Sequence, residues 1–222
     1  MSAATRLRRL DEAAEIVVLE QDDVVSFASC GLPYHVSDTI PDAEDLVVNS
    51  PDEISGLFDL DIRTGHEVVD VDTDERTVTV NADGGTTRVA YDDLVLAPGA
   101  KPIVPPIDGV EDADAVFTLR SVDDAVSIRE RVENTSADRA LVVGAGYIGL
   151  EMAENLHHAG LDVTIAEMED RVMPTALGPG MAALVHNRLR EQGVELQLQT
   201  TVSAVEEGDD RLTVTFDDES SE

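Results

Sequence analysis

Residues 140–167 carry the pattern that most constrains how this chain folds. Ala140–Val143 is a short apolar run, the glycine-rich hexapeptide Gly144–Gly149 (GAGYIG) follows it, and a second apolar run, Val163–Ala166, ends at Glu167. The stretch between the hexapeptide and the second run is long enough for a helix, and strands joined through a helix pair in parallel. This order predicts a βαβ unit and an α/β fold with a parallel sheet.

The hexapeptide also predicts a ligand. In such a unit Gly144 permits the tight turn, Gly146 lets the backbone approach a pyrophosphate, and Gly149 allows the helix to pack closely on the strand. The helix N-terminus supplies N–H donors to the phosphates. Glu167 lies 18 residues after Gly149, where it accepts from a ribose 2′-hydroxyl and repels a 2′-phosphate. We therefore expect a site for NADH, with NADPH as the alternative. Its expected residues are Gly144, Ala145, Gly146, Tyr147, Ile148, Gly149 and Glu167.

Cys30 is the only cysteine in the 222 residues, and it lies in the stretch Ser26–Tyr34 (SFASCGLPY). Gly31 removes a side chain beside the sulfur, and Pro33 suits the first turn of a helix. A thiol at a helix N-terminus meets unpaired N–H groups and the positive end of the helix dipole, which favour the reactive thiolate. Cys30 is therefore our candidate redox residue. The alternative is a small buried hydrophobic residue, as free cysteines usually are.

Acidic residues outnumber basic ones by 47 to 15, which gives a formal net charge of −32. Nucleic-acid binding is disfavoured because phosphate needs a basic patch. Abundant acids with a single lysine are typical of salt-accumulating organisms, where charges are screened within about 3 Å at 1 M salt. One cysteine excludes an intrachain disulfide, and no run approaches the ~18 apolar residues that span a membrane. We expect a cytoplasmic, halophilic protein that binds neither nucleic acid nor membrane.

The N-terminal region reads as the second half of another βαβ unit. Residues 2–10 have helical spacing, and Ile16–Leu19 is an apolar run typical of a buried parallel strand. The apolar residues of the helix share one face: Ala3, Leu7 and Leu10. Glu20 ends the strand. A strand and a glycine-rich turn are expected before such a helix, and Met1 stands in their place, so we expect a domain without its first strand and turn.

The middle of the chain predicts further strands and a boundary. Alternating residues indicate strands over 66–71, 77–81 and 86–91, with a hairpin turn at Asp83–Gly85. The apolar run Leu94–Ala97 indicates another buried strand. The prolines at 102, 105 and 106 then form a stiff connection, which is a plausible domain boundary.

The last part of the chain predicts two more helices. Ser121, with Asp124 three residues later, forms a capping box that opens a helix running to about Glu133. Residues 181–192 form an amphipathic helix, and short strands are expected over 194–199, 201–205 and 212–216. The fold class is therefore α/β, with two doubly wound, Rossmann-like domains, both incomplete.

No metal site is expected. The acids at 70, 72 and 74 imitate the start of a calcium loop, but Glu75 and Asn81 occupy positions that need glycine and glutamate. The adjacent His157 and His158 are expected on a helix surface and not as metal ligands.

Together these stretches resemble the flavoprotein pyridine nucleotide–disulfide oxidoreductases, in the branch with a single redox cysteine. That branch contains coenzyme A-disulfide reductases, NADH oxidases and NADH peroxidases. The matching stretches follow the order of the family and cover essentially the whole chain: residues 8–11 (RRLD), 26–34, 94–102, 117–121 and 144–149. The proline at position 98 resembles the coenzyme A-disulfide reductase group.

The resemblance implies an FAD-binding domain over residues 1–104, a connection and helix over 105–138, and an NAD(P)-binding domain over 139–222. Glu20 would bind the adenosine ribose of FAD. Three further residues would lie near that cofactor: Pro98, Gly99 and Ala100. Hydride would pass from nicotinamide to flavin, and the flavin would reduce sulfur bonded to Cys30. Because Cys30 is solitary, its oxidised form would be a mixed disulfide with coenzyme A or a sulfenic acid.

The resemblance also implies substrate contacts. In the coenzyme A-disulfide reductases these fall on positions that here are Ser2, Arg6, Arg9, Ser26, Ser29 and Arg63. The arginines suit a phosphate-bearing ligand, and ordinary surface charges are the alternative. The complete family is longer at both ends and forms homodimers, so we expect a fragment of a coenzyme A-disulfide reductase. The alternatives are an NADH oxidase or peroxidase acting on oxygen or peroxide, and an inactive fragment that keeps a nucleotide site.

Overall fold

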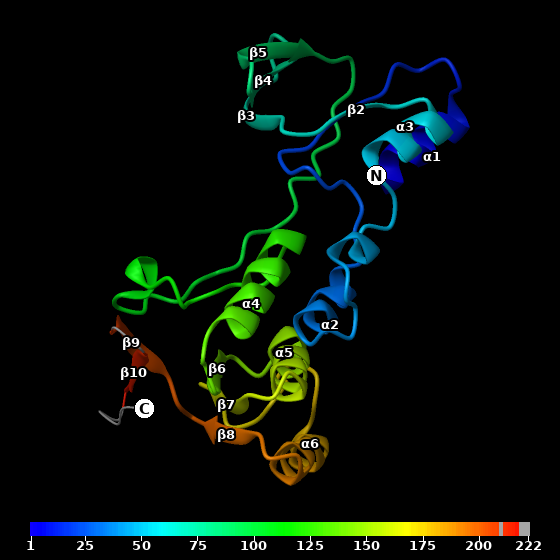
Figure 1. Cartoon of the computed structure of the whole chain (residues 1–222). Coiled ribbons are helices and arrows are strands. Elements are labelled where there is room, and N and C mark those ends of the chain that lie inside the picture. Colours follow the sequence, from blue (N-terminus) through cyan, green and yellow to red (C-terminus); the bar gives the residue numbers. More distant parts are fainter. Residues whose placement is uncertain (209–210, 218–222) are drawn as a thin grey trace. The chain divides into compact units, whose positions relative to one another are not determined.

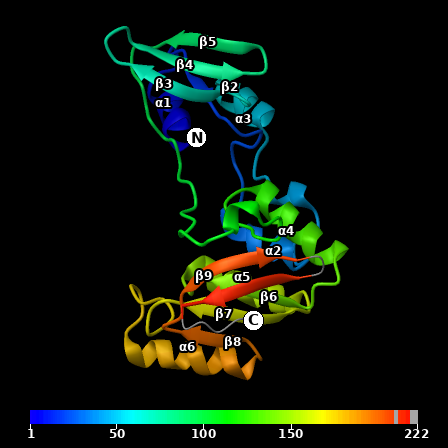
Figure 2. The same cartoon turned by 90° about the vertical axis from the view of Figure 1, so that its left-hand side faces the viewer.

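The computed structural model describes residues 1–208 and 211–217. The chain divides into two compact units: the first comprises residues 1–28 and 44–100, and the second comprises residues 29–43 and 101–222. Figures 1 and 2 show the elements of each unit from two directions. The mixture of helices with parallel and antiparallel sheets confirms the predicted α/β class. No helix in the described part of the chain is long and apolar enough to cross a membrane.

The first unit contains a short parallel pair of strands. β1 (Val17–Leu19) pairs with β2 (Asp61–Arg63), so that Leu19 lies opposite Arg63. Two helices accompany the pair: α1 (Ser2–Leu10) and α3 (Pro51–Phe58). A capping box begins α3, because the Ser50 hydroxyl accepts from the Glu53 N–H while the Glu53 carboxylate accepts from the Ser50 N–H.

Helix α1 forms where the sequence predicts it, but it contacts its neighbours through a different face. The residues of the predicted apolar face are exposed: Ala3, Leu7 and Leu10. Met1 and Ala4 pack instead on the core formed by Ile16 and its neighbours. On the following turn Arg8 donates to the carbonyl oxygens that end α3, at 3.0 Å to Phe58 and 2.6 Å to Asp59. Those carbonyl groups have no partner within their own helix, so an arginine decides which side of α1 turns inward.

The first unit also carries a three-stranded antiparallel sheet. It consists of β3 (Glu67–Asp72), β4 (Thr77–Ala82) and β5 (Gly85–Ala90), with β4 in the centre. Gly85 has φ of +103°, which a turn between β4 and β5 requires and which glycine adopts without strain. The predicted hairpin is confirmed. Asp72 caps the preceding turn by accepting from the N–H groups of Asp74 and Glu75.

The strand predicted at Leu94–Ala97 is absent, and this expectation was wrong. The segment has no assigned strand, and Val95 and Leu96 are 68% and 70% exposed. An apolar run becomes a strand only where neighbouring strands accept its backbone hydrogen bonds. Among the residues that the structure describes, no strand pairs with this run.

The second unit is built on a parallel sheet in the order β6–β7–β8. Its strands are β6 (Arg139–Val143), β7 (Asp162–Glu167) and β8 (Glu195–Leu198). Three helices of at least twelve residues belong to it: α4 (Val122–Asn134), α5 (Tyr147–His158) and α6 (Pro179–Glu191). The predicted capping box of Ser121 and Asp124 begins α4. The predicted elements of this unit are confirmed to within a few residues.

A two-stranded hairpin completes the core of the second unit. β9 (Val202–Glu207) and β10 (Leu212–Phe216) pair antiparallel. Their buried residues Val205 and Phe216 share one cluster with Ala166 of β7, and Leu141 of β6 packs against it. The hairpin therefore covers part of the parallel sheet.

Candidate functional site

The glycine-rich turn joins β6 to α5, and each of its three glycines has a distinct structural reason. Gly144 has φ of +99°, and its N–H donates to the Ala166 carbonyl at 2.8 Å. A Cβ on Gly149 would overlap the carbonyl oxygen of Gly144, so only glycine lets helix and turn approach so closely. A Cβ on Gly146 would meet no atom within 4 Å. The turn is therefore open at Gly146, the residue that the sequence predicts to approach the pyrophosphate.

The first turn of α5 is exposed at this opening. Gly146 is the N-cap and makes no side-chain capping bond, while Tyr147 and Ile148 are 68% and 59% exposed. The first N–H groups of a helix have no partner within it and carry the positive end of its dipole. This twelve-residue helix can therefore accept an anionic group at its N-terminus.

Glu167 lies at the carboxyl end of β7 and hydrogen-bonds to the backbone of the glycine-rich turn. Its side chain is buried, and one carboxylate oxygen accepts from the Ala145 N–H at 2.7 Å. The other oxygen accepts from the Glu169 N–H at 2.9 Å. A carboxylate has about four acceptor positions, so two bonds leave capacity for ribose hydroxyls. Sequence reasoning assigned the ribose to Glu167 and missed this second task.

The β7–α6 loop, residues 168–178, extends the site beyond Glu167. Met173 donates its N–H to the carbonyl of Ala145 at 2.9 Å, which ties the loop to the glycine-rich turn. Arg171 is used inside the loop: it pairs with Asp170 at 2.6 Å and donates to the carbonyls of Pro174 and Leu177. Its guanidinium is thus engaged with loop partners.

Cys30 lies in a 3-10 turn, Ser29–Gly31, directly before helix α2 (Leu32–Val36). Pro33 occupies the first turn of α2, as the sequence predicted. Cys30 is exposed, and so is Ser29. The alternative that Cys30 is a buried hydrophobic residue is therefore wrong.

The segment that carries Cys30 is anchored on the helices of the second unit. At the end of α2, Ser37 donates its hydroxyl to the Asn155 side-chain oxygen on α5 at 2.6 Å, and both residues are buried. Arg129 on α4 pairs with Asp38 at 2.6 Å and donates to the Pro41 carbonyl at 2.8 Å. No local sequence signal marks these contacts, because the residues of each pair are about a hundred positions apart.

The predicted residues of the first unit fall in four places. Glu20 follows β1; its carboxylate accepts from the Asp22 N–H, and its own N–H donates to the Arg63 backbone carbonyl. Arg63 pairs with Asp61, and this hydrogen-bonded carboxylate raises the pKa of the guanidinium. The three predicted residues on α1 are exposed: Ser2, Arg6 and Arg9. Within the described part of the chain, neither of the two arginines forms an ion pair. Ser26 is half-buried, and the stretch 98–100 is exposed.

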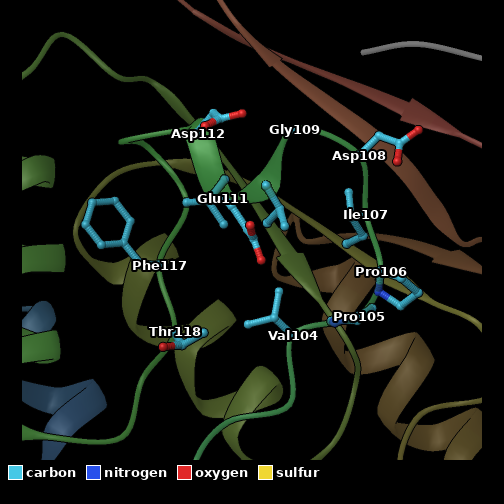
Figure 3. A pocket seen from close by; sticks show the side chains of 12 residues that line it. Val104, Pro105, Pro106, Ile107, Asp108, Gly109, Glu111, Asp112, Phe117 and Thr118 are labelled. Atoms are coloured by element: carbon cyan, nitrogen blue, oxygen red, sulfur yellow. The ribbon is translucent and has the colours of Figure 1, made fainter.

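A hollow of about 560 Å³ lies elsewhere in the second unit. It is lined by residues 104–112 and 116–118, and Figure 3 shows Val104, Ile107 and Glu111 around it. None of the residues predicted from the sequence to bind substrate or cofactor lines this hollow. In the described residues there is also no cluster of histidine, cysteine or acidic side chains suited to a metal ion.

Known proteins match most or all of the chain. It is 41% identical, over 73% of its residues, to the coenzyme A disulfide reductase of Staphylococcus epidermidis, of which it covers 37%. It covers all of itself and 40% of reduced Bacillus anthracis CoADR-RHD, with a TM-score of 0.95 and 41% identity. The water-forming NADH oxidase from Lactobacillus brevis, bound to NADH, matches with a TM-score of 0.92, 33% identity and coverage of 100% of this chain and 49% of that one.

The chain thus spans less than half the length of each of these proteins. The family model of the pyridine nucleotide-disulphide oxidoreductases matches residues 1–222. With an open glycine-rich turn, a buried acid beneath it and this match, the chain belongs to the pyridine nucleotide-disulphide oxidoreductase family.

Proposed function

We propose that this chain is part of an FAD-dependent enzyme that passes two electrons from NADH to a disulfide at Cys30, with coenzyme A disulfide as substrate. The observation that carries the proposal is the exposed thiol on a segment anchored by Ser37 and Arg129 to the helices of the dinucleotide-binding unit. The similarity to coenzyme A disulfide reductases supports the choice of substrate.

The second unit fits NADH. The open turn at Gly146 and the N-terminus of α5 can take the pyrophosphate, and the remaining acceptor capacity of Glu167 suits a ribose 2′-hydroxyl. A 2′-phosphate would meet Glu167 followed by the exposed acids Glu169 and Asp170. Arg171 offsets the charge of Asp170, with which it is paired, but Glu167 and Glu169 remain to repel such a phosphate, so NADH is preferred over NADPH.

The first unit fits one part of FAD. Glu20, at the carboxyl end of β1, suits the adenosine ribose, as the corresponding acid of the second unit does. Among the described residues of the first unit, no glycine-rich turn joins a strand to a helix for the pyrophosphate. FAD, when bound by the complete protein, supplies a two-electron acceptor for hydride from NADH.

Cys30 performs the sulfur chemistry. Its thiolate attacks one sulfur of coenzyme A disulfide, so that one coenzyme A leaves as a thiolate and the other stays bonded to Cys30. Two electrons then break this mixed disulfide and release the second coenzyme A. One NADH thus yields two thiols. Arg6 and Arg9 offer free positive charge on α1 to the phosphates of such a substrate, and Ser2, Ser26, Ser29 and Arg63 are further proposed contacts.

The second candidate is an NADH oxidase or peroxidase. The likeness to the Lactobacillus brevis NADH oxidase favours it, because an exposed solitary thiol can cycle through sulfenic acid without a second cysteine.

For the complete protein we further propose the domain boundaries 1–104, 105–138 and 139–222, a homodimer, a cytoplasmic location and a halophilic source. The acidic excess supports the last of these.

The test is a Cys30→Ser variant of the complete protein, assayed with coenzyme A disulfide, oxygen and hydrogen peroxide. We expect the variant to lose disulfide turnover by at least about 1,000-fold, because serine keeps the shape but removes the redox-active sulfur. NADH binding is expected to stay unchanged. Disulfide turnover retained in the variant would contradict the role of Cys30. Wild-type turnover that is faster with oxygen or peroxide than with coenzyme A disulfide would favour the second candidate.

A further inference from the structure

The β7–α6 loop lies where dinucleotides bind in folds of this type. It follows the carboxyl end of β7, and ligands of doubly wound sheets bind just outside the carboxyl ends of the strands. Its bond from the Met173 N–H to the Ala145 carbonyl makes it continuous with the glycine-rich turn. Met173 has φ of +47°, an uncommon value for a residue with a side chain. Such a loop keeps its shape only if other contacts hold it.

One of these contacts joins Val172, the residue before Met173, to a histidine. The side chain of Val172 is fully buried, and its N–H donates to the Nε2 atom of His186 on α6 at 3.2 Å. A ring nitrogen accepts a hydrogen bond only when it carries no proton. The contact therefore exists only with neutral His186.

The surroundings of His186 favour the neutral form. Burial and the charge of Arg190, one turn along the same helix, lower the pKa of His186, and Asp170 of the loop opposes them. Below the ordinary pKa of about 6.5 the unfolded chain binds a proton more readily than the folded one, so stability falls as the pH decreases through this range. Above pH 6.5 the contribution of neutral His186 to the stability of the fold is complete.

We propose that His186 is a positioning residue for the dinucleotide: as a neutral acceptor it holds the β7–α6 loop in the shape that binds NADH. This rests on the proposed dinucleotide site. When Nε2 gains a proton, two N–H groups face each other and the loop loses the contact between Val172 and α6. Dinucleotide affinity is therefore full at pH 8 and falls as the pH decreases through the lowered pKa of His186 in the folded protein.

The experiment measures the dissociation constant of NAD⁺, which withstands acid better than NADH, by calorimetry on the 222-residue chain between pH 5.5 and 8. The wild type is expected to weaken about 3- to 10-fold towards acid, the range of one hydrogen bond. His186→Gln supplies an amide oxygen that accepts at every pH, so its profile is expected to be flat and close to the wild-type value at pH 8. His186→Leu is expected to be weak at every pH.

Two controls separate the possible failures. His158→Gln changes an exposed histidine at the end of α5 and is expected to keep the wild-type profile. Gly149→Val blocks the turn and is expected to lose binding. If His186→Gln retains the acid weakening, the role of His186 is overturned while the dinucleotide site stands. If the wild type binds no NAD⁺ at pH 8, or Gly149→Val binds as well as the wild type, the site and the inference both fall. The comparison of glutamine with wild type holds even if the leucine variant does not fold.

Discussion

The two acids that follow parallel strands, Glu167 in the second unit and Glu20 in the first, have the same place in sequence and different surroundings. β7 is paired on both sides, by β6 and β8, and Glu167 is buried beneath the glycine-rich turn. Among the strands that the structure describes, β1 is paired only with β2, and Glu20 is half-buried and accepts from a local N–H, that of Asp22. A strand ending in an acid is therefore half of a nucleotide site. The neighbouring strand and its turn supply the other half.

The largest expected effect is on the binding of the two cofactors. The 222-residue chain is expected to bind NADH, whereas its dissociation constant for FAD is expected to be at least about 100-fold higher than that of a protein with a complete flavin site. Two missing charge-assisted hydrogen bonds to the pyrophosphate, each worth about 1.5–3 kcal/mol, account for such a difference. Flavin absorbance of the purified chain and titration with each cofactor measure it. Tightly held, stoichiometric FAD would contradict the comparison.

Substitutions at two glycines, one in each unit, compare how closely the surrounding atoms pack against the backbone. Gly149→Val places side-chain atoms against the Gly144 carbonyl and is expected to lower the free energy of unfolding by about 1–3 kcal/mol. Gly56→Ala lies within α3, where a Cβ meets nothing within 4 Å, and is expected to raise it by about 0.5–1 kcal/mol. Denaturant titration of both variants measures the difference. Equal effects would mean that the turn tolerates a side chain.

The two acids can be exchanged for alanine in the same way. Glu167→Ala leaves the Ala145 N–H without its acceptor, and we expect about 1–3 kcal/mol lower stability and a smaller preference for NADH over NADPH. Glu20→Ala removes one bond from a half-buried side chain, so a change below about 0.5 kcal/mol is expected. Thermal unfolding and binding of both nucleotides are the measurements. An unchanged nucleotide preference in Glu167→Ala would remove the role given to this acid.

Salt is expected to change the stability of both units together. With a net charge of −32, self-repulsion opposes folding at low ionic strength, so the melting temperature is expected to rise by on the order of 5 °C between 0.1 and 1 M KCl. Hydrogen exchange in each unit would show whether both units gain protection. A melting temperature independent of KCl would contradict the halophilic interpretation.

Several features of this protein follow from the sequence alone because they depend on neighbours in the chain. The turn at Gly144–Gly149, the capping box at Ser121 and the hairpin ending at Gly85 form where predicted. Each is specified within about six residues, by a required positive φ, a close backbone approach or a side chain that caps a helix. The place of Cys30 before a helix containing Pro33 also followed from local signals.

Other features were decided only by the tertiary structure, because they depend on partners far along the chain. Ser37 and Asn155 are 118 residues apart, and Arg129 and Asp38 are 91 apart, so no local pattern places the Cys30 segment on the second unit. The apolar run at Leu94–Ala97 shows the converse: its local pattern indicates a strand, but no paired strand exists in the described residues to make it one. A backbone hydrogen bond needs both its donor and its acceptor, and the sequence of one segment supplies only one of them.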